Sequence, residues 1–175
     1  MKQLEIGPGQ FSLGTDWDAM DMINRPHVNI HHDCRKMPFP IKDNTYDLIY
    51  LSHILEHIPW FQTVDFLKEL KRILKPGGSI EVWVPDLKKL VQAYLDPSLV
   101  KNDGWYKFNP EKNPTKWFNG RLFTYGPEEE NWHRAAFDKE FLTKCFNDAG
   151  LKPFDITKPR GYDHGWINLG LGGKK

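Results

Sequence analysis

Short apolar runs alternate with amphipathic stretches along this chain, and each kind of stretch predicts a different element. The apolar runs predict buried strands at residues 4–6, 17–20, 28–32, 46–51 and 79–84, with two more at 154–157 and 166–171. Stretches with apolar residues three or four positions apart predict helices at 59–75, 87–95 and 139–149. Strands that alternate with helices are typical of a parallel α/β sheet, and the last two strands are expected to close it as a hairpin.

Polar residues and glycines at the ends of the predicted helices set their limits. Asp86 and Asp138 can each cap a helix start, because an aspartate accepts hydrogen bonds from first-turn amides. Gly150 is expected to end the last helix, and the run 75–78 (Lys-Pro-Gly-Gly) the first, since proline cannot continue a helix. The expected core-facing residues are Leu87, Leu90, Val91 and Tyr94 on the second helix, and Phe141, Leu142, Cys145 and Phe146 on the third.

The connections around the second predicted strand are unusually short. Seven residues separate Gly9 from Trp17, whereas a parallel crossover normally needs a dozen or more residues and a helix. Either these crossovers are loops, or the second strand lies outside the sheet.

The expected fold class is α/β and Rossmann-like, with a mainly parallel twisted sheet, an antiparallel C-terminal strand and a reduced N-terminal part. A second copy of the chain could cover sheet left bare by missing helices, as a homodimer.

Residues 96–134 interrupt the alternation of strands and helices. This segment holds four prolines and eight aromatic residues, which are Trp105, Tyr106, Phe108, Trp117, Phe118, Phe123, Tyr125 and Trp132. A long irregular segment is usually functional or disordered, and the aromatic content argues against disorder. We expect a single domain over residues 1–175, with 96–134 as a folded lid or substrate-binding insert.

Composition narrows the partners and the cellular location. Lys plus Arg is 24 and Asp plus Glu is 23, without the basic excess of a general nucleic-acid binder. Cys34 and Cys145 lie far apart and lack metal-ligand spacing, so reduced thiols are expected rather than a disulfide or a zinc site. No apolar run is long enough for a membrane span, and no secretory leader precedes the first strand. A cytoplasmic protein is expected.

The first predicted strand ends in a tight glycine turn, Gly7-Pro8-Gly9, of the kind that lets a backbone approach a ligand closely. Asp21 ends the second predicted strand, where a carboxylate can accept both ribose hydroxyls, and Asp33 ends the third, where it can accept an adenine amino proton. All three would lie on one edge of a parallel sheet, which favours a nucleoside-type cofactor. Ser12 stands where a dinucleotide fingerprint needs a third glycine, and this disfavours a dinucleotide-dependent oxidoreductase.

Three histidines are candidates for chemistry. His53 and His57 lie four residues apart, so one helical face would carry both, as a metal pair, as a base with its helper, or as helix-start polar residues. The His-Glu-x-x-His order is absent, and no metal site is expected. His53 could act as a general base, and a buried structural role is favoured for His57. His133 and Arg134 could meet a substrate carboxylate or phosphate, or form a plain salt bridge.

Taken in order, several motifs resemble the class I S-adenosylmethionine-dependent methyltransferases, most nearly the branch called methyltransferase type 11. The motifs are residues 5–9 (Glu-Ile-Gly-Pro-Gly), Asp21, residues 33–39 (Asp-Cys-Arg-Lys-Met-Pro-Phe), residues 46–57 (Tyr-Asp-Leu-Ile-Tyr-Leu-Ser-His-Ile-Leu-Glu-His) and residues 74–78 (Leu-Lys-Pro-Gly-Gly). The resemblance covers roughly residues 3–95, and the stretch 132–137 extends it. The short loop after Gly9 and the missing helix before the first strand depart from the family pattern and expose the cofactor edge.

The resemblance implies a role for each matching position. Glu5 and the turn Gly7, Pro8 and Gly9 would hold the methionine part of S-adenosylmethionine. Asp21 would bind the ribose, and Asp33 with the Cys34 backbone would bind the adenine. Leu51, Ser52 and His53 would lie along the methionine and near the methyl group.

The predicted function is methyl transfer to oxygen or nitrogen of a small molecule, a sugar or a lipid headgroup. Methyl transfer mainly needs alignment, because the sulfonium is already activated. The motifs used on nucleic-acid bases, Asn/Asp-Pro-Pro-aromatic and a Pro-Cys nucleophile, are absent. Among the histidines, His53, His57 and His133 are the candidate catalytic residues. The alternative is a non-catalytic module that keeps the fold and the cofactor pocket.

Overall fold

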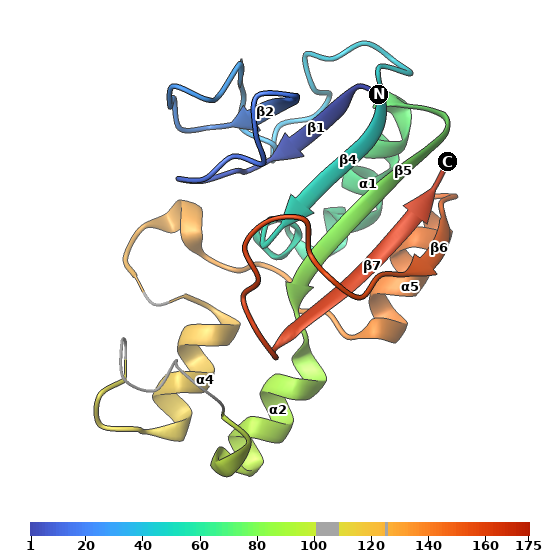
Figure 1. Cartoon of the computed structure of the whole chain (residues 1–175). Helices are drawn as coiled ribbons and strands as arrows, with labels where there is room; N and C mark the ends of the chain where they lie inside the picture. Colours follow the sequence, from blue (N-terminus) through green and yellow to red (C-terminus); the bar gives the residue numbers. More distant parts are fainter. Residues whose placement is uncertain (101–108, 125) are drawn as a thin grey trace.

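The computed structural model describes residues 1–100, 109–124 and 126–175, which form one seven-stranded sheet with helices packed against it (Figure 1). The strands are β1 (Gln3–Ile6), β2 (Trp17–Asp21), β3 (Ile30–His31), β4 (Tyr46–Ser52), β5 (Leu74–Pro85), β6 (Lys152–Asp155) and β7 (Asn168–Lys174). The helices are α1 (Thr63–Ile73), α2 (Leu87–Leu95), α4 (Pro114–Leu122) and α5 (Lys139–Asp148). Within the described ranges, no helix combines the length and the apolar character that a membrane span requires.

The strand order is β3-β2-β1-β4-β5-β7-β6. Strands β3, β2, β1, β4 and β5 run parallel, and β7 is antiparallel to both β5 and β6. This arrangement confirms the predicted Rossmann-like sheet with an antiparallel C-terminal strand. The chain leaves β1 toward β2 on one side and returns to β4 on the other, so the order reverses between β1 and β4. In open α/β sheets such a reversal opens a ligand crevice at the carboxyl ends of the strands.

The two faces of the sheet are covered differently. Helices α1 and α5 lie behind the sheet in Figure 1 and bury an apolar layer. The strands supply alternate side chains to this layer, as the two-residue period of a strand requires, and its members include Leu4, Ile6, Ile49, Leu51, Ile80, Val82 and Val84.

The opposite face carries a row of polar and aromatic residues in register. Glu5 lies beside Tyr50, which lies beside Glu81. The segment 156–167 crosses this face in front of the sheet (Figure 1). Arg160 binds both carboxylate oxygens of Glu81, with its Nε 2.7 Å from Oε2, and the Gly161 amide lies 3.4 Å from the Tyr50 hydroxyl oxygen. A loop therefore takes the place of a helical layer here.

The two short crossovers are loops, and β2 is a full member of the sheet. Residues 7–16 and 22–29 contain no helix, yet β2 pairs with β1 over four residues and with β3 over two. The strand predicted at 28–32 is shorter than expected, because only Ile30 and His31 pair. This resolves the alternatives that the sequence left open.

Several predicted boundaries are confirmed and others are corrected. Helix α2 has the predicted limits, and the Asp86 carboxylate accepts from the Lys88 and Lys89 amides. The helix predicted at 59–75 is a 3₁₀ turn (Trp60–Gln62) followed by α1. The run 75–78 lies within β5, where the register with β4 shifts between the pairs Tyr46–Leu74 and Leu48–Ser79. Val91 is 39% exposed and Tyr94 40% exposed, so the predicted face of α2 is wrong at both positions.

Part of the segment 96–134 folds against α2. A small second core unites Leu90 and Ala93 of α2 with Trp117 of α4 and with Ile167. Asn113 caps α4 by accepting from the Lys116 amide. The packing of α2 against Trp117 and Ile167 explains why Leu90 and Ala93 are its buried positions. Four of the aromatic residues predicted to fold this segment, Trp105, Tyr106, Phe108 and Tyr125, lie outside the described residues.

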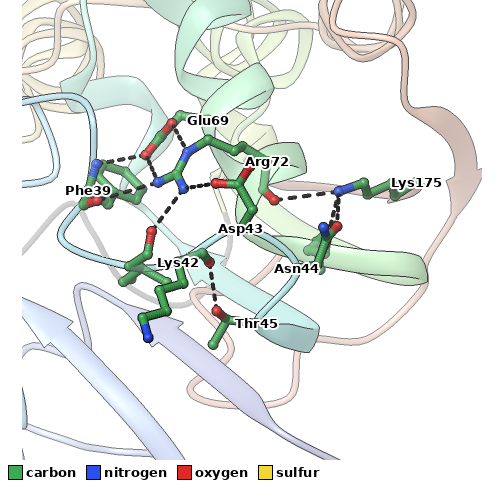
Figure 2. A network of polar contacts seen from close by, with 10 residues as sticks. Phe39, Lys42, Asp43, Asn44, Thr45, Glu69, Arg72 and Lys175 are labelled. Atoms are coloured by element: carbon green, nitrogen blue, oxygen red, sulfur yellow. Dashed lines mark hydrogen bonds and ion pairs between the residues drawn. The ribbon is translucent and has the colours of Figure 1, made fainter.

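A network of polar contacts holds the loop between β3 and β4 against α1 (Figure 2). Arg72 donates to Glu69, with its Nε 2.8 Å from Oε2, and also to Asp43 and to the Ile41 carbonyl. Glu69 in turn accepts from the Phe39 amide at 2.7 Å. The Arg72 hydrogen bond holds the pKa of Glu69 below its ordinary value. This network lies beside the starts of β4 and β5, at Tyr46 and Leu74.

Candidate active site at the carboxyl edge of the sheet

Three cavities adjoin at the carboxyl ends of β1, β2 and β4. The β2-side cavity, of about 210 Å³, is lined by Asp21, Asp33 and Cys34 among others. The β1-side cavity, of about 480 Å³, is lined by residues 5–13 together with Ser52 and Tyr162. The histidine cavity, of about 380 Å³, is lined by His57, His133 and His164, together with described residues of 120–124 and 126–131. His53 borders all three.

The two glycines of the turn after β1 have different surroundings. Both have positive φ, +67° at Gly7 and +61° at Gly9. A Cβ on Gly7 would lie 2.0 Å from Cδ1 of Ile54, whereas a Cβ on Gly9 would meet nothing within 4 Å. Gly7 thus lets Ile54 pack against the backbone, and Gly9 leaves open space where the β1-side and β2-side cavities meet.

The two carboxylates of the β2-side cavity are already engaged. Asp21 accepts from the Ile23 amide at 2.8 Å and from the Gly9 amide at 3.3 Å, and Arg25 lies 3.3 Å away. Arg35 binds Asp33 through both Nε and Nη2, at 2.9 and 3.0 Å, and these bonds hold the pKa of Asp33 below its ordinary value. A ligand would therefore share these carboxylates with arginines of the same chain.

Two further residues of the cofactor side are Cys34, which is half-buried, and Glu5, which is buried. Burial raises the pKa of the Cys34 thiol to about 12, so the thiol stays protonated and does not act as a nucleophile. Glu5 accepts from the Leu13 amide at 2.8 Å, which ties the loop after the glycine turn to β1. Burial raises the pKa of Glu5, and the Leu13 bond offsets part of that rise.

His53 ends β4 in an unusual conformation, with φ at +56°. Its Nδ1 lies 3.1 Å from the Glu56 carboxylate, and its Nε2 lies 3.0 Å from Oδ1 of Asn168. The Asn168 amide nitrogen donates to Asp163, which orients the amide oxygen toward the imidazole. Both ring nitrogens thus face acceptors, as an imidazolium requires. Burial lowers the pKa of His53, but the Glu56 carboxylate and the Asn168 hydrogen bond together raise it by more, and the net shift is upward.

Glu56 and His133 complete the charge balance beside His53. Glu56 is 1% exposed. Burial raises its pKa, but the facing imidazoles of His53, His57 and His133 lower it by more, so Glu56 is a carboxylate. Burial lowers the pKa of His133, and Glu56 offsets only part of this, so His133 is a neutral imidazole. A histidine with a raised pKa at the junction and one with a lowered pKa in the adjoining cavity have different chemical capacities.

The structure brings most of the predicted site residues together and separates a few. Glu5, Gly7, Pro8, Gly9 and Ser52 line the β1-side cavity, while Asp21, Asp33 and Cys34 line the β2-side cavity. Leu51 lines none of the three cavities, because its side chain points into the apolar layer under α1. His53 and His57 do not share a helical face, since His53 lies in a left-handed turn and His57 ends a 3₁₀ turn (Leu55–His57). Arg134 pairs with Glu129 at 2.9 Å.

Sequence reasoning missed three residues of this site. Glu56 balances the histidines, Asn168 orients His53, and the ring of His164 lies against that of His53, tilted by 36° with centroids 3.9 Å apart. Asn168 and His164 come from the far end of the chain, so only the fold brings them near β4. Glu56 could have been found, because its position between His53 and His57 is visible in the sequence.

The known proteins to which this chain is similar are methyltransferases. A family model described as a methyltransferase domain matches residues 16–82. A demethylmenaquinone methyltransferase from Geobacillus sp. (strain WCH70) is 29% identical over 153 residues, which are 83% of this chain and 56% of that protein. The same enzyme from Staphylococcus saprophyticus is 30% identical over 152 residues, with 83% and 56% covered. The chain spans little more than half the length of these curated relatives.

Solved structures agree on the fold. A SAM-dependent methyltransferase from Aquifex aeolicus aligns over 99% of this chain and 81% of its own, with a TM-score of 0.58 and 18% identity. A Burkholderia thailandensis 1,6-didemethyltoxoflavin-N1-methyltransferase, solved with S-adenosylhomocysteine, aligns over 99% and 70%, with a TM-score of 0.59 and 15% identity. The chain has the class I methyltransferase fold, as its motifs predicted, and S-adenosylmethionine is the cofactor of that class.

Proposed function

We propose that this chain transfers a methyl group from S-adenosylmethionine to an oxygen or nitrogen of a small-molecule acceptor. The observation that carries the proposal is the position of His53, which borders the two cofactor-side cavities and the histidine cavity at once. Methyl transfer needs the donor and the acceptor in line at one point. The junction at His53 is such a point.

The residues on the cofactor side fit S-adenosylmethionine in kind and in arrangement. Asp21 would accept the ribose hydroxyls, and Asp33 with the Cys34 backbone would hold the adenine in the β2-side cavity. Glu5, Ser52 and the turn 7–9 would hold the methionine part in the β1-side cavity. The open space at Gly9, where a Cβ would meet nothing, is the passage between the two parts. When bound, the cofactor supplies a methyl group on a positively charged sulfur.

The histidines take different roles in this proposal. Both ring nitrogens of His53 face acceptors, Glu56 and Asn168, so it serves as a positioning residue that holds the shape of the junction. His133 is neutral and faces the histidine cavity, so it is better suited than His53 to take a proton from an acceptor. His57 orients the loop over the cavity through the Trp132 carbonyl, 3.2 Å from its Nδ1.

The segment 96–134 is proposed as the lid over the acceptor. Its described part lines the histidine cavity with Gly120, Arg121, Thr124 and Glu128. An acceptor of modest size, such as a sugar, a lipid headgroup or another small metabolite, suits a cavity of about 380 Å³. The names of the curated relatives specify demethylmenaquinone for those enzymes. A single domain, a homodimer and a cytoplasmic location stay predictions from the sequence.

One observation favours a second candidate, a non-catalytic module that binds the cofactor weakly or not at all. Asp21 and Asp33 are both paired with arginines of the chain itself, and these pairs compete with ribose and adenine contacts.

Calorimetric titration with S-adenosylmethionine, S-adenosylhomocysteine and NAD, in the presence of EDTA, separates the candidates. Binding of the first two alone supports the proposal and justifies an acceptor screen. Absence of any binding would favour the module.

Asp21→Ala tests the ribose contact. We expect the affinity for S-adenosylmethionine to fall by roughly 1–3 kcal/mol, the scale of lost charge-assisted hydrogen bonds. Asp16→Ala, at an exposed position before β2, is the matched control and should leave the affinity unchanged. Equal affinity in Asp21→Ala and in the wild-type chain would remove Asp21 from the site.

A further inference from the structure

Three side chains at one end of the histidine cavity carry donor atoms of the kind that bind transition metals. One ligand atom each from Glu56, His57 and His133 lies within 4.8 Å of the other two. Glu56 and His57 are neighbours in the 3₁₀ turn after β4, and His133 comes from the far end of the proposed lid. We propose that these three residues bind a divalent first-row transition-metal ion, a site that the sequence alone did not predict.

The Glu56 carboxylate is the first reason. Its side chain is 1% exposed, and its Oε1 faces His53 Nδ1 at 3.1 Å. Neither carboxylate oxygen has a hydrogen-bond partner among the described residues, and Oε2 has no ion-pair partner in them either. A buried carboxylate oxygen without a partner is costly, and such atoms in native proteins usually meet a donor or an ion. A cation between Glu56 and the two imidazoles would satisfy this oxygen.

The tautomer of His57 is the second reason. Its Nδ1 lies 3.2 Å from the Trp132 carbonyl oxygen, which can only accept, so Nδ1 carries the hydrogen. The lone pair is then on Nε2. Histidines that bind metals usually donate their other ring nitrogen to a carbonyl or a carboxylate in this way, which fixes the ring and raises its basicity.

Backbone hydrogen bonds hold the third residue in place. The Glu56 carbonyl accepts from the Arg134 amide at 2.7 Å and from the Ala135 amide at 3.0 Å. The stretch 133–135 is therefore fixed against the turn that carries Glu56 and His57, and the rings of His57 and His133 meet edge to face at 4.9 Å. The set is built by the fold rather than by flexible side chains meeting at the surface.

The donor set selects the kind of ion. Two imidazoles and one carboxylate bind Zn²⁺ or Fe²⁺, whereas Mg²⁺ and Ca²⁺ prefer oxygen ligands throughout. Metal–ligand bonds of about 2 Å put neighbouring ligands about 3–4 Å apart, so the side chains would close on the ion by about an ångström. Three protein ligands leave at least one coordination position free.

The free position bears on the acceptor, and this step rests on the proposed function. His57 and His133 both line the histidine cavity, so an ion that they hold would also border it. An ion held there would occupy the lone pair of His133, so the ion, rather than the imidazole, would activate the acceptor. A metal ion polarises a bound hydroxyl and lowers its pKa. An acceptor that presents a hydroxyl oxygen is therefore favoured over one that presents only an amine.

Titration with Co²⁺ tests the site directly, because the visible absorption of bound Co²⁺ reports its ligands. The chain is first treated with EDTA and desalted. We expect one Co²⁺ per chain, and an affinity at least tenfold lower in His57→Gln and in His133→Gln. His31→Gln is the matched control, because His31 is exposed and does not belong to the cluster of Glu56, His57 and His133, and it should bind as the wild type does.

Glu56→Gln tests the carboxylate ligand, provided that thermal unfolding shows that this variant folds. If it does not fold, the two histidine variants still test the metal site. No Co²⁺ binding, or binding unchanged in both histidine variants, would overturn the metal site. Binding of S-adenosylmethionine in EDTA is measured separately. A chain that binds the cofactor but not Co²⁺ refutes only the metal site, and one that binds Co²⁺ but not the cofactor refutes only the proposed function.

Discussion

Gly7 and Gly9 share a backbone conformation and differ in what a side chain would meet. At Gly7 a methyl group would collide with Ile54, and at Gly9 it would enter the open space between two cavities. The sequence predicted that the pair forms a tight turn near a ligand. It could not predict which glycine serves packing and which serves binding, because Ile54 follows a different strand.

Gly7→Ala and Gly9→Ala should therefore fail in different ways. We expect Gly7→Ala to lose about 2 kcal/mol or more of unfolding free energy, since strain at positive φ adds to a steric clash. Gly9→Ala should lose only about 1–2 kcal/mol from positive φ, yet bind S-adenosylmethionine at least tenfold more weakly because its methyl group occupies the passage. Denaturant unfolding and calorimetry measure the two quantities. If Gly9→Ala binds normally, the cofactor does not pass over this turn.

Interactions between neighbouring residues made the caps and boundaries of single helices predictable. Which helix faces are buried depended on tertiary packing. Asp86 and Asp138 cap α2 and α5 as their sequence positions indicated, because a cap involves only neighbouring residues. The apolar spacing of α2 did not reveal that Val91 and Tyr94 stay exposed, since α2 packs on α4 rather than on the sheet. The Glu56–His57–His133 cluster needed the fold for the same reason.

The network around Arg72 should stabilise α1 and the loop before β4 in a pH-dependent way. Glu69→Gln keeps the shape but removes the charge that pairs with Arg72, and we expect it to cost about 1–3 kcal/mol of unfolding free energy at neutral pH. Because the native pKa of Glu69 is lowered, its stabilisation is present above its ordinary value of 4.5 and is lost as pH falls through the native pKa.

The thermal midpoints of Glu69→Gln and the wild-type chain should thus converge at acid pH. Asp65→Asn is the matched control, since its partner Lys68 is exposed on the same helix and the pair is 3.2 Å apart at the surface. It should change the midpoint little at any pH. A constant difference between Glu69→Gln and the wild type down to acid pH would show that the Glu69 charge is not what stabilises the loop.

At the scale of the whole molecule, two segments distant in sequence close the carboxyl edge of the sheet from two sides. The segment 156–167 is fixed by Arg160 on Glu81 and lines the β1-side cavity with Gly161, Tyr162 and His164. The described part of the segment 96–134 packs on α2 through Trp117 and lines mainly the histidine cavity. A sheet without its N-terminal crossover helices thus acquires walls for both cavities from loops and from α4, which residue spacing could not have shown.

This division predicts different consequences for damage to each segment. Arg160→Gln loosens the wall of the β1-side cavity, so we expect S-adenosylmethionine affinity to fall about three- to tenfold, or roughly 1 kcal/mol. Trp117→Phe loosens the proposed lid, and the affinity for the cofactor should stay within about twofold of wild type, because α4 lines the histidine cavity and not the β1-side cavity. Calorimetry on both variants, with thermal unfolding to verify the fold, measures the contrast. Equal losses of affinity in the two variants would mean that both segments close over one shared site. The cofactor and the acceptor would then have no separate walls.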